Sequence, residues 1–155
     1  MYEQLKLDNQ LCFPFYAVSR LITRAYQYDL DTLGITYPQY LVLMILWEND
    51  HVTVNDVADK LILNTNTVTP LLKRMEVLDL LTRKQSKTDQ RKVIISLTEK
   101  GIELQHKAAQ IPIRLMQKLN IEPNENQLAD FLKLKNQLNS LIDLLKIMHK
   151  KQTTS

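Results

Sequence analysis

Apolar residues recur at helical intervals along most of the chain. Between residues 11 and 33 they return every three or four positions with polar residues between them, which predicts one long amphipathic helix. Gly34 follows and suits a helix stop. Thr36-Tyr37-Pro38 then begins a second helix with a proline in its first turn, and the strongly apolar segment YLVLMILWEN carries that helix to Asn49.

Two shorter helices are predicted next. Thr53 suits an N-cap, Asp56 stands at the capping-box position, and apolar residues follow at helical spacing. After a break at Leu63-Asn64, a helix over residues 65–78 turns apolar side chains to one side and polar or basic ones to the other. Pro70 could kink or shorten the first turn of that helix. Two short helices joined by a tight turn, the second with a polar outer face, indicate a helix-turn-helix.

A β-hairpin is predicted directly after these helices. The segments LLTRK and KVIISL flank the polar loop QSKTDQR, and apolar residues alternate along the second segment. A hairpin with a basic tip in this position is typical of the wing of a winged helix. The expected fold is therefore mainly α with a small β-hairpin wing.

The C-terminal part is predicted to be helical as well. Thr98-Glu99 begins a helix to about Leu119, with an interruption possible at Pro112. After Glu122-Pro123, a last helix carries apolar residues at spacings of three and four, as in a heptad seam. The seam consists of Phe131, Leu134, Leu138, Leu141, Leu145 and Met148, and it is widened by Leu128, Leu132, Ile142 and Leu144. So broad a stripe predicts a homodimer, and packing against the first helix of the same chain is the alternative.

These patterns divide the chain into regions. We expect residues 1–35 and 100–150 to form a helical dimerisation region and residues 36–99 to form a winged helix-turn-helix DNA-binding domain. Residues 151–155 are expected to be a disordered tail.

The charge distribution favours nucleic acid as the partner of the middle region. The 155-residue chain has a net charge of +3, whereas residues 73–92 hold seven basic and three acidic residues and so carry +4. No apolar run approaches the roughly 20 residues that span a bilayer, and the N-terminus MYEQLKLDNQ has no apolar signal core. We therefore expect a cytoplasmic protein with no membrane partner. His51, His106 and His149 lack ligand spacing, so neither a metal nor another cofactor is expected.

The single cysteine, Cys12, lies in the segment NQLCFPFY where the first helix begins. Pro14 fits only the first turn of a helix, because it lacks an N–H and disfavours helical geometry at the residue before it. Cys12 is therefore expected at the helix N-terminus, whose partial positive charge favours the thiolate that peroxides oxidise. Tyr16 shares its helical face. An inert thiol that fills the core is the alternative.

Four segments in this order resemble the MarR family and, within it, the organic-hydroperoxide-sensing OhrR branch of the one-cysteine type. They are KLDNQLCFPFYAVSR, ITYPQYLVLMILWEN, TVTPLLKRME and TDQRKVIISLTEKG. The resemblance covers residues 6 to about 119 and, more loosely, the final helix. It implies a dimeric winged-helix repressor, not an enzyme, whose reduced form binds double-stranded operator DNA and whose oxidised form releases it.

The helix over residues 65–78 is expected to enter the major groove of that DNA. Its first-turn residues would reach base edges, and its later basic residues would reach phosphates. Helix capping is the alternative for Asn64 and Thr65. In the wing, Arg91 would reach the minor groove and be held by Asp89 in the family's D-x-R pattern, unless the two form only a solvated ion pair. The expected DNA-binding residues are Thr65, Asn66, Thr67, Thr69, Lys73, Arg74, Arg83, Lys84, Lys87, Asp89 and Arg91.

Tyr26 and Tyr37 match the tyrosines that hydrogen-bond the reactive thiol in OhrR relatives. On a continuous helix, Cys12 and Tyr26 would lie about 21 Å apart, because each residue rises about 1.5 Å. Tyr26 could therefore contact Cys12 only from the other subunit. Aromatic core packing is the alternative for Tyr16, Tyr26 and Tyr37.

Oxidation by an organic hydroperoxide would give a sulfenic acid at Cys12. Because the chain has no second cysteine, the trap would be a small-thiol adduct, the second copy of Cys12, or overoxidation. The change would respace two recognition helices that must fit major grooves roughly 34 Å apart. Two other functions stay open, namely a MarR-type regulator controlled by a phenolic or other apolar ligand and, with less support, a thiol peroxidase.

Overall fold

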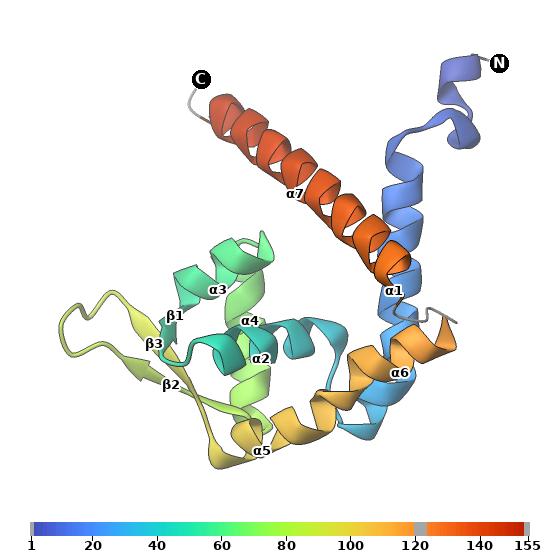
Figure 1. Ribbon diagram of the computed structural model, residues 1–155. Coiled ribbons are helices and arrows are strands. Elements are labelled where there is room, and N and C mark those ends of the chain that lie inside the picture. Colours follow the sequence, from blue (N-terminus) through green and yellow to red (C-terminus); the bar gives the residue numbers. More distant parts are fainter. Residues whose placement is uncertain (1, 120–123, 154–155) are drawn as a thin grey trace. The chain divides into compact units, whose positions relative to one another are not determined.

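The computed structural model describes residues 2–119 and 124–153 (Figure 1). The chain divides into two compact units, residues 1–115 and residues 116–155. The first unit contains the sheet and all candidate residues for DNA binding and thiol chemistry.

The described residues form helices and one small antiparallel sheet, as the sequence predicts. Two 3-10 turns, Glu3–Leu5 and Leu7–Asn9, precede the first α-helix. The helices are α1 (Cys12–Thr32), α2 (Tyr37–Glu48), α3 (Val54–Leu61), α4 (Thr65–Val77), α5 (Glu99–Ala108), α6 (Gln110–Lys118) and α7 (Glu125–Thr153). The strands are β1 (Val52–Thr53), β2 (Leu81–Gln85) and β3 (Val93–Leu97).

Helix α1 is unbroken and ends at the predicted glycine. Gly34 has a φ of 70°, which glycine adopts without a steric penalty. Its N–H donates to the Asp31 carbonyl at 3.0 Å, and the Ile35 N–H donates to the Leu30 carbonyl at 3.2 Å. This pair of bonds is a Schellman motif, so the predicted stop is confirmed.

Capping boxes begin α2 and α3. The Thr36 N–H donates to Gln39 Oε1 at 2.8 Å. The Thr53 N–H donates to Asp56 Oδ2 at 2.8 Å, and the Asp56 N–H donates back to Thr53 Oγ1 at 3.1 Å. Each box satisfies backbone donors that a helix start leaves without partners. The predicted helix-turn-helix is confirmed, with Ile62 at a φ of 56° in the turn between α3 and α4.

Two prolines, Pro70 and Pro112, were expected to disturb the helices that contain them. Helix α4 begins at Thr65 and continues through Pro70 without being shortened. Pro112 is the third residue of α6, and the break between α5 and α6 lies at Ala109 rather than at the proline as expected. A proline in a first turn leaves no hydrogen bond unmade, so the helix restarts before Pro112.

The sheet has the strand order β1-β3-β2, so β2 is an edge strand. Arg83 of β2 pairs with Ile95 of β3, and the loop between these strands projects from the end of the sheet (Figure 1). The predicted hairpin is confirmed. Strand β1 was not predicted, because two residues carry no alternation and Thr53 also caps α3.

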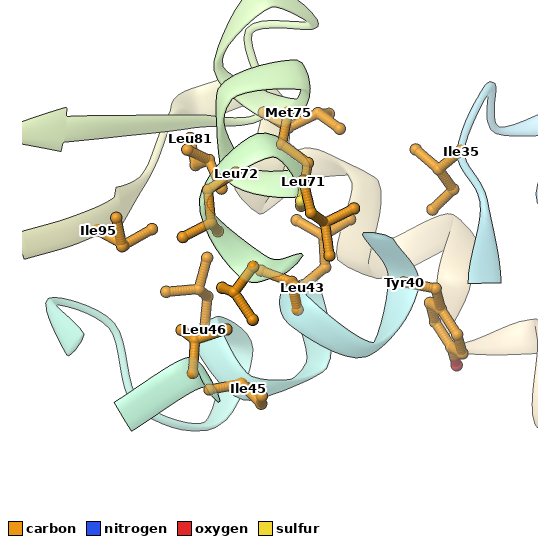
Figure 2. Close-up of a cluster of buried hydrophobic side chains, with 14 of the residues drawn as sticks. Ile35, Tyr40, Leu43, Ile45, Leu46, Leu71, Leu72, Met75, Leu81 and Ile95 are labelled. Carbon is orange, nitrogen blue, oxygen red and sulfur yellow. The ribbon is translucent and has the colours of Figure 1, made fainter. Parts of the chain in front are cut away.

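The core of the first unit lies where α2, α3 and α4 meet the sheet. Leu43 and Leu46 of α2 point toward Leu72 of α4, and Ile95 of the sheet lies beside them (Figure 2). All four are buried, as is Val57 of α3. Burying such side chains contributes on the order of 2 kcal/mol each. This packing fixes α4 against the wing.

Helix α7 makes up most of the second unit. Its predicted seam is exposed along most of its length, including Phe131, Leu134, Leu145 and Met148. The helix extends to Thr153, where a disordered tail was expected from residue 151, and residues 154–155 lie outside the described part. No helix among the described residues is long and apolar enough to cross a membrane.

Candidate functional site

A hollow of about 250 Å³ separates α4 from the wing. Four of the predicted DNA-binding residues line it, namely Thr65, Thr69, Arg83 and Arg91. Sequence reasoning missed the others, which are Thr53, Val54, Asn55, Lys92 and Val93. Asn55 lies on the first turn of α3, and no local pattern connects that turn with β3. The fold thus brings residues of α3, α4 and the wing to one polar surface.

The N-terminal turn of α4 presents its polar residues to solvent. Thr65, Asn66 and Thr67 are exposed, and Thr69 is half-buried beside the wing. Asn64 occupies the N-cap position, but its side chain makes no capping hydrogen bond. Capping therefore does not account for Asn64. Lys73 and Arg74 are exposed farther along the helix.

The side chain of Arg83 is more buried than that of a typical surface arginine. Only 18% of its side chain is exposed, and its Nη1 lies 3.6 Å from Glu76 Oε2. The Arg83 backbone N–H also donates to Glu76 Oε1 at 3.0 Å. Its Nε is buried with no hydrogen-bond partner in the described part of the chain.

Arg91, in contrast, extends from the wing. Its side chain is 91% exposed, and its Nε and backbone N–H donate to the same oxygen of Asp89, at 3.2 and 3.1 Å. These bonds hold the pKa of Asp89 below its usual range, and the bond from the Arg91 side chain has the larger effect. Asp89 therefore stays ionised and orients Arg91. Lys84 and Lys87 are exposed on the same hairpin.

The cysteine lies at the position that the proline argument gave. Cys12 is the first residue of α1, and it is exposed. Tyr16, one turn on, is also exposed, and its ring lies 6.5 Å from that of Phe13. The alternative of a core-filling thiol does not hold within a single chain.

Tyr26 and Tyr37 lie together at the other end of α1. Their ring centroids are 5.2 Å apart, and Tyr40 packs on both, at 5.9 and 6.4 Å. Burial raises the pKa of all three phenols, so their hydroxyls stay protonated as donors at neutral pH. Tyr40, which sequence reasoning missed, stands one helical turn after Tyr37.

No group of three or more His, Cys, Asp or Glu residues that could hold a metal ion occurs in the described ranges.

The chain is similar to several known transcriptional regulators. The family described as "Transcriptional regulator SarA/Rot" matches residues 24–108. The organic hydroperoxide resistance transcriptional regulator of Bacillus subtilis is 45% identical over 150 residues, which is 97% of either chain. Among solved structures, reduced AbfR bound to DNA is 38% identical with a TM-score of 0.68, covering 91% of this chain and 98% of that one. Overoxidised AbfR bound to DNA is 39% identical with a TM-score of 0.67, covering 90% and 97%. AbfR comes from Staphylococcus epidermidis.

Proposed function

The chain belongs to the MarR family of transcriptional regulators, in its OhrR-like branch, and on this premise we propose that it is a redox-sensing repressor. It binds operator DNA as a homodimer while Cys12 is reduced and leaves the DNA when an organic hydroperoxide oxidises that thiol. The observation that carries the proposal is the exposed, sole cysteine at the first residue of α1. The named relatives are regulators, one of organic hydroperoxide resistance, rather than enzymes. As a DNA-binding protein, it acts in the cytoplasm.

Helix α4 enters the major groove of the operator. Thr65, Asn66 and Thr67 reach base edges, because they occupy the exposed N-terminal turn. Lys73, Arg74, Lys84 and Lys87 are exposed and contact phosphates. Arg91, oriented by Asp89, enters the adjacent minor groove. Reduced AbfR is bound to DNA, which supports this role for a related chain.

The sensor is completed by the second subunit. Helix α1 is continuous, so about 21 Å separate Cys12 from Tyr26 within one chain. The half-buried pair Tyr26 and Tyr37 therefore meets Cys12 of the partner, where their protonated hydroxyls donate to the thiolate. Tyr16 shares the helical face of Cys12 and packs at the same junction.

Oxidation proceeds by attack of the Cys12 thiolate on the hydroperoxide. An S–O bond forms to the terminal oxygen, which keeps its hydrogen and gives the sulfenic acid, as the O–O bond breaks. The alkoxide that leaves takes a proton from solvent and becomes the alcohol. A second thiol then displaces water from the sulfenic acid and forms a disulfide. Overoxidised AbfR is still bound to DNA, which favours a small-thiol adduct as the releasing form. A disulfide between the two copies of Cys12 does not fit this arrangement, because each Cys12 meets tyrosines that lie about 21 Å from the partner's Cys12.

Replacing the sulfur tests this proposal. Cys12→Ser should bind DNA as the wild type does and should not respond to cumene hydroperoxide, because a serine hydroxyl cannot be oxidised to a sulfenic acid. The measurement is a gel shift on a duplex that the wild-type protein selects from a random-sequence pool, paired with mass spectrometry of residue 12. Release of the serine variant by the peroxide would overturn the proposal.

The same assay distinguishes this redox mechanism from the alternative, in which a phenolic ligand controls the regulator. Salicylate added to the reduced wild-type complex should leave it on DNA. Release by salicylate at concentrations where peroxide has no effect would favour the ligand-controlled alternative.

A further inference from the structure

We infer that Glu76 is a positioning residue for DNA binding, which fixes the wing against the recognition helix through Arg83. The inference rests on the proposed function, since it assumes that α4 and the wing contact one duplex. It also changes the role of Arg83, which becomes an internal link between the two DNA-binding elements instead of a free phosphate contact.

The first observation is the place of Glu76 on α4. Residues at positions 65, 69 and 76 lie within about 40° of one another around a helix of 3.6 residues per turn. Glu76 therefore shares the face of Thr65 and Thr69, which line the hollow toward the wing. At the C-terminal end of α4, the Glu76 carboxylate is the group on this face that contacts the wing.

The second observation is that both carboxylate oxygens of Glu76 are used by one residue. Oε1 accepts the Arg83 backbone N–H at 3.0 Å, and Oε2 lies 3.6 Å from Arg83 Nη1. Strand β2 is an edge of the sheet, where outward-facing N–H groups have no second strand to pair with, and this N–H donates to Glu76 instead. Glu76 thus holds both the strand edge and the guanidinium.

The third observation is the burial of Arg83. With 18% of its side chain exposed and its Nε buried, it cannot swing out to a phosphate as the exposed Lys84 beside it can. Arg83 instead lines the hollow with Thr69 of α4 and Arg91 of the wing. Fixing this side chain therefore fixes the spacing between helix α4, which enters the major groove, and Arg91, which enters the minor groove.

Charge alone predicts the opposite effect of removing Glu76. A carboxylate near the DNA-facing surface repels phosphates, so its loss should tighten binding if the residue does nothing else. If it positions the wing, its loss should weaken binding. The sign of the effect therefore decides between the two.

The test is Glu76→Gln, which keeps an oxygen for the Arg83 N–H and loses only the charge that faces the guanidinium. We expect about tenfold weaker binding to the duplex selected by the wild type, because loss of the ion pair leaves Arg83 and the wing free to depart from the spacing that the duplex requires. The slope of log affinity against log salt should not change, because no phosphate contact is lost. Arg91→Ala, by comparison, should lower that slope by about one.

Two controls complete the experiment. Glu103→Gln removes an equal charge from the exposed face of α5 and should bind at least as tightly as the wild type. Arg83→Lys keeps the charge but lacks the planar fork, so it should weaken binding as Glu76→Gln does, and the two effects should not add. Melting of the unbound variants checks that they fold.

Binding of Glu76→Gln that equals or exceeds the wild type, or a steeper salt slope from a released Arg83, would overturn the inference and leave the proposed function intact. A wild-type protein that selects no duplex would overturn both.

Discussion

Gly101 shows how a single residue fixes the end of the wing against α5. A Cβ at this position would stand 2.1 Å from the Leu80 carbonyl oxygen, a backbone atom that cannot turn aside. The Gly101 N–H donates to Thr98 Oγ1 at 3.1 Å, and its carbonyl accepts the Trp47 indole N–H at 2.9 Å. The close approach lets α5, the end of α4 and α2 meet at one point.

We therefore expect Gly101→Ala to destabilise the protein. Overpacking against fixed atoms costs about 1–3 kcal/mol, more than the gain of up to about 1 kcal/mol from alanine's better helix propensity. The free energy of unfolding in urea measures the difference.

Gly34→Ala is the control at a different kind of glycine. Its Cβ meets nothing within 4 Å, and only the φ of 70° opposes it, at about 1 kcal/mol. A Gly101→Ala protein as stable as the wild type would show that the backbone at Leu80 gives way.

At the scale of elements, the sequence was sufficient where the signals are local. The capping box of α3, the start of α2 at Thr36-Tyr37-Pro38 and the glycine stop of α1 depend on residues within one turn, and all were predicted. The capping box of α2 between Thr36 and Gln39 was not predicted. The basic cluster over residues 73–92 likewise predicted a nucleic-acid partner from the sequence alone.

What sequence reasoning missed depends on contacts across long separations. Glu76 counted only as one acidic residue until the hairpin placed Arg83 beside it. Tyr40 looked like part of an apolar run, although it packs on Tyr26 of another helix. Strand β1 exists only through its pairing with β3. Helical periodicity carries no information about such partners.

The tyrosines that join α1 to α2 make stability depend on pH. Burial raises the pKa of Tyr26, Tyr37 and Tyr40 above the 10.0 of an exposed phenol. The unfolded chain therefore loses these protons first as pH rises. Their contribution is fully present below pH 10 and is lost as pH rises through the folded-state pKa values.

Urea unfolding at pH values on either side of 10 should show this fall in stability. Tyr37→Phe removes one of the three groups and should flatten the fall. A stability that is constant across this range would contradict the burial of the phenols.

At the scale of the whole molecule, exposed apolar surface calls for a second copy. Helix α7 exposes Phe131 and Leu145, and α1 exposes Val18 and Leu21. A single soluble chain does not usually leave so much apolar surface uncovered. We expect the homodimer to cover it.

A charge in the seam of α7 tests this expectation. Leu138→Lys should weaken dimerisation about tenfold or more, because it buries an unpaired charge at the interface. Asn136→Lys, on the opposite face of the helix, should leave dimerisation unchanged. Sedimentation at several protein concentrations measures both, and a Leu138→Lys protein that stays dimeric would place the interface elsewhere.

The unbroken length of α1 has a genetic consequence. In the proposed dimer each sensor takes its sulfur from one polypeptide and its phenols from the other. The Cys12 and the Tyr26 on one helix α1 therefore belong to different sensors. Two alleles, one without Cys12 and one without Tyr26, would each encode a regulator that peroxide does not release from DNA. Expressed together, they would assemble mixed pairs in which one sensor is whole, and peroxide responsiveness would return by complementation.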